Sequence, residues 1–253
     1  MIILKSEEEV SKISVACQIV AETLQLLKEN VKPGVTTEDL DRIAEESIRK
    51  KGGIPAFKGY RSFPATLCAS VNSEVVHGIP SKKHTLSEGD IIGLDLGAIY
   101  DGFYGDAAIT VPVGKITKEA EKLIRITEES LFKGIDQAKI GNRLSDISHA
   151  VQIHVESAGY TVVRDFVGHG IGRNLHEEPQ IPNYGDPGQG PRLKKGMVLA
   201  LEPMVNMGDS AVNILSDKWT VVTKDGSLSA HFEHTIAITE LGPVILTSMK
   251  KDQ

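Results

Sequence analysis

The feature that most constrains the fold of this chain is an internal repeat at one constant offset. Helix breakers, an aspartate early in a helix and a strand-like segment recur in the second half at the same spacing: Gly34 with Gly141, Asp39 with Asp146, Gly52 with Gly159, and LSEGDIIGLD (86–95) with LKKGMVLALE (193–202). A chance similarity would rarely keep one constant offset over two helices and a strand. The sequence therefore predicts two structural halves, about 1–115 and 116–253, related by a pseudo-two-fold axis within a single domain, 1–253. Each half then contributes one carboxylate, Asp95 and Glu202, to a shared centre.

Each half is expected to begin with two helices. The capping-box pattern Ser6–Glu9 begins the first helix, and apolar residues at helical spacing extend it to about Glu29. The second helix begins at Thr36 or Thr37 and ends before Gly52. Four further elements are predicted: helices over Thr117–Ala138 and Leu144–Ser157, a strand over Thr66–Val71, and a hairpin over Trp219–Thr239 about the turn Asp225-Gly226.

The segment from Ile91 to Asp106 carries carboxylates where a core strand would carry apolar side chains. If 91–97 is a strand, its side chains alternate between an apolar face and a face that holds Asp95. A buried lone carboxylate is unfavourable unless it is paired or bound to a metal. The turn-like Asp101-Gly102 would fold the chain back and bring Asp106 beside Asp95. From this segment alone, two surface aspartates in strand ends and turns remain an alternative.

Elsewhere the chain offers further side chains of the types that bind metals. His169 lies at a strand end before a glycine loop, and Glu233 lies on a strand whose polar neighbours His231 and Thr235 share its face. The candidate metal ligands are Asp95, Asp106, His169, Glu202 and Glu233. Four carboxylates and one imidazole suit two divalent ions better than one, and the set favours Co, Mn, Fe or Zn. A two-metal site lowers the pKa of bound water from 15.7 to about 7, which is hydrolytic chemistry.

Composition narrows the class of protein. The 253 residues are 40% hydrophobic with a net charge of −6, and the absence of a basic stripe argues against a nucleic-acid binder. The start, MIILKSEEEV, resembles neither a signal nor a transit peptide, and no run of 18 apolar residues predicts a membrane span. Cys17 and Cys68 are the only cysteines, which favours a reducing compartment. We therefore expect a cytoplasmic globular protein.

Five segments together resemble the type I methionine aminopeptidases in their short form: HGIP (77–80), DLGAIYDGFYGDAAITV (95–111), GHGIGRNLHEEPQIPNYG (168–185), LALEPM (199–204) and SAHFEHT (229–235). The motifs occur in order over nearly the whole chain. The resemblance implies an α+β pita-bread fold, an antiparallel sheet covered by helices with an internal pseudo-two-fold, as a single catalytic domain. It also implies that Asp106 and Glu233 bridge two metal ions, while Asp95 serves one ion and His169 with Glu202 the other.

The resemblance further implies a reaction. The chain would remove the N-terminal methionine from nascent proteins and peptides, preferring a small second residue, through a hydroxide that bridges the two metals. His176 would donate to the carbonyl oxygen, Glu202 would carry the proton, and His77 would hydrogen-bond the substrate near the scissile amide. The residues implied to contact substrate are Tyr60, Phe63, Cys68, His77, His176 and Trp219.

For some of these residues, the sequence alone is equally compatible with a purely structural role. Trp219 also fits a core position of its hairpin, because large aromatic side chains mainly serve packing. His77 and His176 are equally compatible with structural positions. Phe57 and Leu175 stand where relatives often have Cys and Phe, so the outline of the methionine pocket differs there.

Two other functions are compatible with the same fold. One is a non-catalytic pita-bread protein that binds partners, which the loss of a metal ligand would favour; none of the candidate ligands is missing. The other is an X-Pro aminopeptidase. The expected partners are peptide and nascent-protein N-termini, and the ribosome is a further candidate partner. We expect no binding to a membrane and no specific binding to nucleic acid, and we expect the protein to be a monomer.

Overall fold

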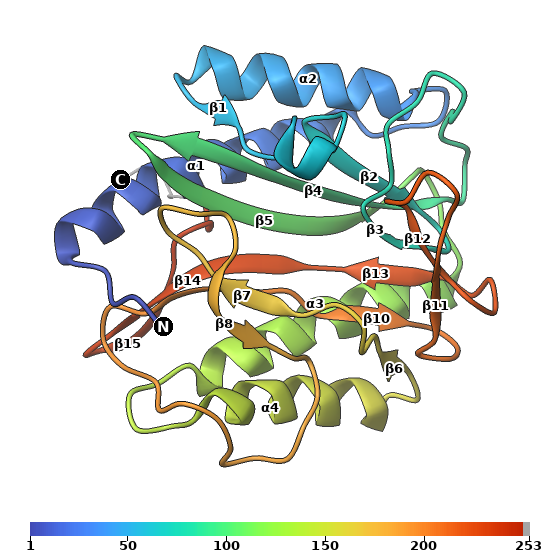
Figure 1. Cartoon of the computed structure of the whole chain (residues 1–253). Helices are drawn as coiled ribbons and strands as arrows, with labels where there is room; N and C mark the ends of the chain where they lie inside the picture. The colour runs from blue at the N-terminus through green and yellow to red at the C-terminus, as the bar shows by residue number, and fades with distance from the viewer. Residues whose placement is uncertain (250–253) are drawn as a thin grey trace.

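A nine-stranded antiparallel sheet runs through the centre of the molecule in the computed structural model, which describes residues 1–249 (Figure 1). Its strands are β1 (Ile54–Pro55), β2 (Leu67–Val71), β4 (Ile91–Tyr100), β5 (Phe103–Pro112), β7 (Gly168–Gly170), β8 (Glu177–Ile181), β9 (Val198–Leu201), β14 (Glu233–Thr239) and β15 (Gly242–Ile245). They follow the order β1-β4-β5-β14-β9-β7-β8, while β2 pairs with β4 and β15 with β14. The two halves of the chain meet where β5 pairs with β14. The last residues of the predicted second half, 250–253, lie outside the described part of the chain.

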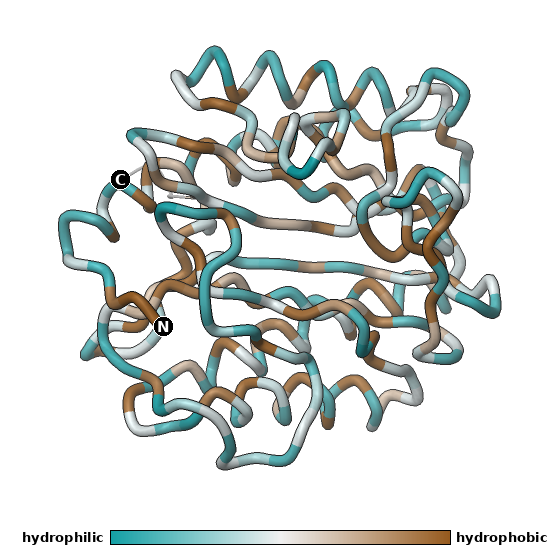
Figure 2. Tube along the Cα trace, in the orientation of Figure 1, coloured by the Kyte–Doolittle hydropathy of each residue, from teal (hydrophilic) through white to brown (hydrophobic). Residues whose placement is uncertain are grey.

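Within residues 1–249, four α-helices cover the sheet: α1 (Glu7–Asn30), α2 (Thr37–Lys50), α3 (Lys118–Gln137) and α4 (Leu144–Ser157). α1 and α2 lie over strands of the first half, and α3 and α4 lie with the second half (Figure 1). Figure 2 shows hydrophobic and hydrophilic segments alternating along α2 and α4, as expected of helices that cover a core on one side. Ile92, Leu94 and Leu96 of β4 are fully buried among side chains of α1 and α2. The opposite face of β4 is therefore free to carry the site.

The predicted repeat is visible as two equivalent helix starts. Thr36 and Arg143 occupy the N-cap positions of α2 and α4, and the backbone N–H of each donates to an aspartate three residues later. Each cap also forms an isolated antiparallel bridge, Thr36 with Thr85 and Arg143 with Arg192. The same local hydrogen bonds thus recur in both halves, as the predicted repeat requires.

α1 is long and apolar enough to cross a membrane by length and composition alone, with a mean hydropathy of 1.2 over 18 residues. Half of that window is buried inside the molecule, and the helix packs along β4 and β5. The capping box predicted at its start is present: the N–H of Glu9 donates to Oγ of Ser6, and the N–H of Ser6 donates to the Glu9 carboxylate. We therefore describe α1 as the covering helix of the sheet.

The predicted hairpin over 219–239 is wrong. Six short strands form two further sheets among the described residues, β11-β12-β3 and β13-β10-β6; their bounds are β3 (Glu74–Val76), β6 (Thr161–Val162), β10 (Met204–Asn206), β11 (Val212–Ile214), β12 (Val221–Thr223) and β13 (Ser229–His231). The chain does turn between β12 and β13, but the two strands join different sheets. The N–H groups of Thr223 and Ser229 both donate to carbonyl oxygens of the 72–73 segment, each at 2.9 Å. This segment separates the strands that the turn would otherwise have paired.

Candidate metal centre and adjoining cavity

The register of the central sheet places three candidate ligands on one face. Asp95 of β4 and Glu233 of β14 each lie opposite Ala108 of β5. Asp106 lies on β5 two residues before Ala108, and side chains two residues apart in a strand point to the same face. Residues directly opposite one another in antiparallel strands also share a face. All three carboxylates therefore project from the side of the sheet that faces away from the helix-covered core.

The other two candidate ligands reach the same face through strands of the second half. His169 of β7 lies opposite Ala200 of β9, which lies opposite Thr235 of β14. Thr235 is two residues from Glu233, and Glu202 follows Ala200 by two residues, just past the end of β9. Alternation along the strands therefore carries both side chains to the face that holds the other carboxylates.

The ligand atoms of these side chains lie close together. Nε2 of His169 is 3.5 Å from Oε1 of Glu202 and 4.0 Å from Oδ2 of Asp106. One atom each from Asp106, His169 and Glu233 lie within 4.8 Å of one another, and all three side chains are buried. Asp95 and Glu202 line the same cavity. The structure thus brings together all five side chains singled out in the sequence.

Unpaired oxygens at this centre indicate that cations would fit it. Oδ1 of Asp95, Oδ1 of Asp106 and Oε1 of Glu233 are buried without a hydrogen-bond partner in the described part of the chain. Buried charged carboxylates are unfavourable unless they are paired, hydrogen-bonded or bound to a metal. A donor set of carboxylate oxygens and one imidazole nitrogen suits divalent ions such as Mn, Fe, Co or Zn. The residues present therefore fit a divalent metal centre.

The electrostatics of the cluster lead to the same conclusion. Burial raises the pKa of Asp95 to about 7. Burial, followed by repulsion from neighbouring carboxylates, holds the pKa values of Asp106, Glu202 and Glu233 well above their ordinary range. Burial lowers the pKa of His169 to about 4, so its imidazole is neutral near pH 7, the form that binds a metal. Carboxylates this close together retain protons unless positive charge enters the site.

A cavity of about 270 Å³ adjoins the candidate ligands. Besides those five, it is lined by all six residues expected to contact substrate: Tyr60, Phe63, Cys68, His77, His176 and Trp219. Phe57, Leu175 and His231, which the sequence also drew attention to, line it as well. The sequence reasoning missed five other lining residues: Arg61, Val76, Phe166, Val167 and Met204. All but Arg61 lie in a recognised motif or within two residues of one. Closeness to the motifs in the sequence was therefore a signal that could have found them.

Aromatic rings form one wall of the cavity. The rings of Phe63 and Trp219 meet edge to face at 5.1 Å, and those of Trp219 and His77 at 5.9 Å. Trp219 is therefore part of the cavity wall and not only a packing residue of its own segment. Cys68 lies opposite Asp95 in the sheet. Burial, with the nearby carboxylates as a further cause, raises the pKa of the Cys68 thiol well above its ordinary value, so this side chain is a neutral wall residue.

Two histidines stand at the junction of the cavity and the candidate ligands. His77 has a left-handed φ of +61°, uncommon for a residue with a side chain and a kind of strain that clusters at functional sites. Burial lowers the pKa of His77 to about 4 and also lowers that of His176. The Nδ1 of His176 is 2.8 Å from the hydroxyl of Tyr60, and its ring lies 4.4 Å from that of His169. Near pH 7 both rings are therefore neutral hydrogen-bonding groups.

Known proteins resemble this chain along nearly its whole length. The model of metallopeptidase family M24 matches residues 11–240. A methionine aminopeptidase of Clostridium acetobutylicum is 59% identical over 247 residues, covering 98% of this chain and 99% of the relative. The structure of methionine aminopeptidase from Thermotoga maritima has a TM-score of 0.97 at 50% identity, covering 98% of this chain and 100% of that one. A prolidase from Pyrococcus furiosus, 24% identical with a TM-score of 0.78, is similar in fold over 98% of this chain and 66% of its own. These likenesses confirm the expected α+β pita-bread fold.

Proposed function

We propose that this chain, which belongs to metallopeptidase family M24 and within it to the methionine aminopeptidases, removes the N-terminal methionine from peptides and nascent proteins. Membership of this family makes it a metal-dependent hydrolase. The observation that carries the proposal is that one cavity is lined both by the candidate metal ligands and by an aromatic wall. The alternative of a non-catalytic binding protein is not supported, because every ligand type that the chemistry needs is present.

We propose that Asp95, Asp106, His169, Glu202 and Glu233 would hold two divalent ions. The unpaired buried oxygens of three of these carboxylates support the assignment. When bound, such ions supply a water of lowered pKa for attack on a carbonyl carbon, and positive charge that polarises the carbonyl. Calorimetric titration of the metal-free protein tests the number of ions: saturation at two per chain is expected, and saturation at one would refute a centre for two ions.

Protein side chains would do the remaining work on the substrate. If the Tyr60 hydroxyl donates its hydrogen bond to Nδ1 of His176, the proton of the neutral imidazole stays on Nε2. The Nε2–H group can then donate to the substrate carbonyl oxygen as negative charge develops on that oxygen. Glu202 would take a proton on a carboxylate oxygen and pass it to the leaving amine. His77 would hydrogen-bond the substrate beside the scissile amide.

The cavity also bears on which N-termini are cleaved. The rings of Phe63 and Trp219 and the thiol of Cys68 offer soft, apolar contacts, which suit the thioether of methionine. We also propose a preference for small residues in the second position, by likeness to the methionine aminopeptidases that this chain matches.

A methionine-release assay tests the proposal directly. The metal-free protein is assayed with Met-Ala-Ser, Met-Leu-Ser and an Ala-Pro peptide, and the series is repeated with Co, Mn, Fe and Zn separately. We expect release of methionine only with metal, faster from Met-Ala-Ser than from Met-Leu-Ser, and negligible cleavage of the Ala-Pro peptide. Faster cleavage of the Ala-Pro peptide would instead establish the X-Pro alternative.

We further propose that the protein acts in the cytoplasm as a monomer, on nascent chains that emerge from the ribosome. The free, buried thiols of Cys17 and Cys68 support a reducing compartment. Sedimentation of the purified protein tests the monomer, and co-sedimentation with ribosomes tests the association.

A further inference from the structure

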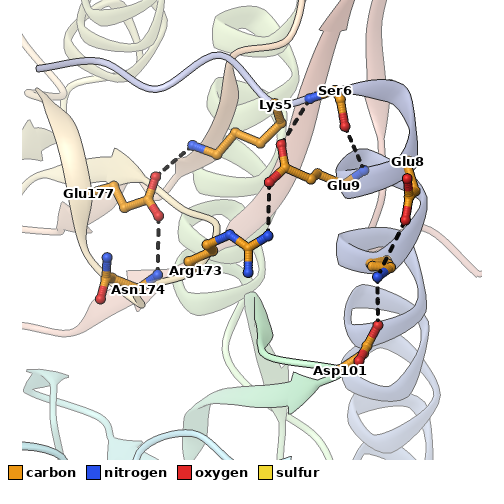
Figure 3. A network of polar contacts seen from close by, with 9 residues as sticks. Lys5, Ser6, Glu8, Glu9, Asp101, Arg173, Asn174 and Glu177 are labelled. Atoms are coloured by element: carbon orange, nitrogen blue, oxygen red, sulfur yellow. Dashed lines mark hydrogen bonds and ion pairs between the residues drawn. The ribbon is translucent and has the colours of Figure 1, made fainter.

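The segment that precedes α1 contacts the loop that carries His176. We call residues Gly172–Glu177 the histidine loop. Lys5 donates from Nζ to Oε2 of Glu177 at 2.6 Å, a contact between residues 172 positions apart (Figure 3). Only 4% and 5% of these two side chains is exposed. The other oxygen of Glu177 accepts the backbone N–H of Asn174 at 3.1 Å, so one carboxylate joins Lys5 to the backbone of the loop.

The surroundings of this ion pair leave it little freedom. A Cβ on Gly172 would lie 2.6 Å from Cε of Lys5 and 2.9 Å from Oε1 of Glu177. The backbone N–H of Lys5 donates to the carbonyl of Gly196 at 2.7 Å, and a Cβ on Gly196 would lie 2.7 Å from the carbonyl oxygen of Lys5. Because both its backbone and its side chain are held, Lys5 is a fixed anchor for the histidine loop.

The Lys5 pair differs from the other ion pairs of the same network. Lys12 and Asp101 lie 2.9 Å apart, with 39% and 58% of their side chains exposed. Exposed pairs of this kind contribute little to stability. A buried pair must be stripped of water, so it is weak support for stability and is often better explained by the conformation it specifies. The conformation that Lys5 specifies is that of the histidine loop.

The position of His176 explains why this conformation matters. His176 is joined directly to Glu177, and its ring lies between Tyr60 and His169. The hydroxyl of Tyr60 can orient the ring but does not hold the backbone that carries it. The Gly172 carbonyl accepts the N–H of Tyr104 at 2.8 Å, and the exposed Arg173 pairs with Glu9. The side chain of Glu177 is the buried charged group that adds a tie between this backbone and Lys5.

We propose that Lys5 is a positioning residue for the aminopeptidase reaction: its buried ion pair with Glu177 holds the histidine loop so that His176 reaches the carbonyl oxygen of the substrate. The proposal rests on the role of His176 given under the proposed function. Lys5 pairs with Glu177 and does not line the cavity that holds the candidate metal ligands and the aromatic wall. Its loss should therefore weaken an interaction made in the transition state and leave substrate binding intact. Such a loss lowers kcat and leaves KM nearly unchanged.

Two matched variants test the proposal in the metal-loaded enzyme. Lys5→Met removes the buried charge, and Lys12→Met makes the same substitution at the exposed pair on α1. We expect Lys5→Met to lower kcat for Met-Ala-Ser by about 10- to 100-fold, since a misplacement of about 1 Å can cost a factor of this size. Hydrogen exchange at the amides of the histidine loop should become faster in the same variant. Lys12→Met should change neither. Equal kcat values for the two variants would overturn the proposal.

A double-mutant cycle with His176→Ala separates this inference from the proposed role of His176. If Lys5 acts through His176, Lys5→Met should cause no further loss of kcat in the His176→Ala background. Additive losses would overturn the positioning role while leaving that of His176 in place, whereas full activity of His176→Ala alone would refute the role of His176 itself. Should Lys5→Met fail to fold, the same cycle with Glu177→Gln, which keeps an acceptor for Asn174, gives the same decision.

Discussion

Gly105 offers a sharp test of how the sheet positions the metal centre. It lies on β5 directly before Asp106, where α1 crosses the strand. A Cβ at this position would lie 2.6 Å from the backbone nitrogen of Cys17 and 2.8 Å from the carbonyl carbon of Ala16. Both atoms belong to the backbone of α1, which cannot turn aside as a flexible side chain can. Gly105→Ala must therefore push the helix and the strand apart.

Two opposing effects set the change in the free energy of unfolding that Gly105→Ala causes. Overpacking costs about 1–3 kcal/mol, and a clash with backbone belongs at the upper end of that range. Replacing glycine by alanine also reduces the conformational entropy of the unfolded chain, which stabilises the folded protein by about 0.4–1 kcal/mol. The free energy of unfolding should thus fall by about 2 kcal/mol, which for a chain of this length lowers Tm by about 4–8 °C. Because β5 carries Asp106, metal affinity should fall as well.

Gly93→Ala is the matched control for this experiment. Gly93 lies on the neighbouring strand β4, and a Cβ there would meet only ordinary contacts, the nearest being the carbonyl oxygen of Ser70 at 3.6 Å. Urea unfolding of the metal-free proteins should show Gly93→Ala at or above the stability of the parent and Gly105→Ala clearly below it. Equal stabilities for the two variants would refute the reasoning from close approach.

Three further outcomes are expected from the centre itself. Asp106→Asn should raise the free energy of unfolding of the metal-free protein, because it removes one of several mutually repelling buried carboxylates, and should abolish the rise in Tm on adding Mn; a thermal melt with and without Mn measures both. In the metal-free protein the pKa of Asp95 is about 7 against an ordinary value of 3.8, so the folded state keeps a proton that the unfolded chain releases. The contribution of Asp95 to stability should therefore fall as pH rises from about 4 to about 7, whereas His77 and His169, whose pKa values burial lowers to about 4, act in the opposite direction. Urea unfolding of the parent and of Asp95→Asn isolates the aspartate: the stability of the parent relative to the variant should fall across this window, and a constant difference would contradict the burial of Asp95. Cys68→Ala should change KM without altering the pH profile of kcat, since a neutral wall thiol takes no part in proton transfer; a shifted profile in peptide assays would refute this.

Local signals in the sequence were sufficient for the helices and for the ligand candidates. The capping box at Ser6, the glycine breakers and the apolar spacing act over a few residues, so they mark helix ends without knowledge of the fold. Asp95 was conspicuous because a carboxylate interrupts an otherwise apolar strand. The repeat then linked Asp95 to Glu202, because a duplicated unit keeps its register.

What depends on distant backbone could be decided only by the tertiary structure. The turn after Thr223 is a strong hairpin signal, yet its strands separate because both donate hydrogen bonds to the 72–73 segment. The lining role of Arg61 and the buried pair of Lys5 with Glu177 have no local pattern at all. The sequence by itself determined which residue types were available for a metal-dependent hydrolase and in which strands. The packing of the two halves decided which of them meet, because burial and distance belong to the folded chain as a whole.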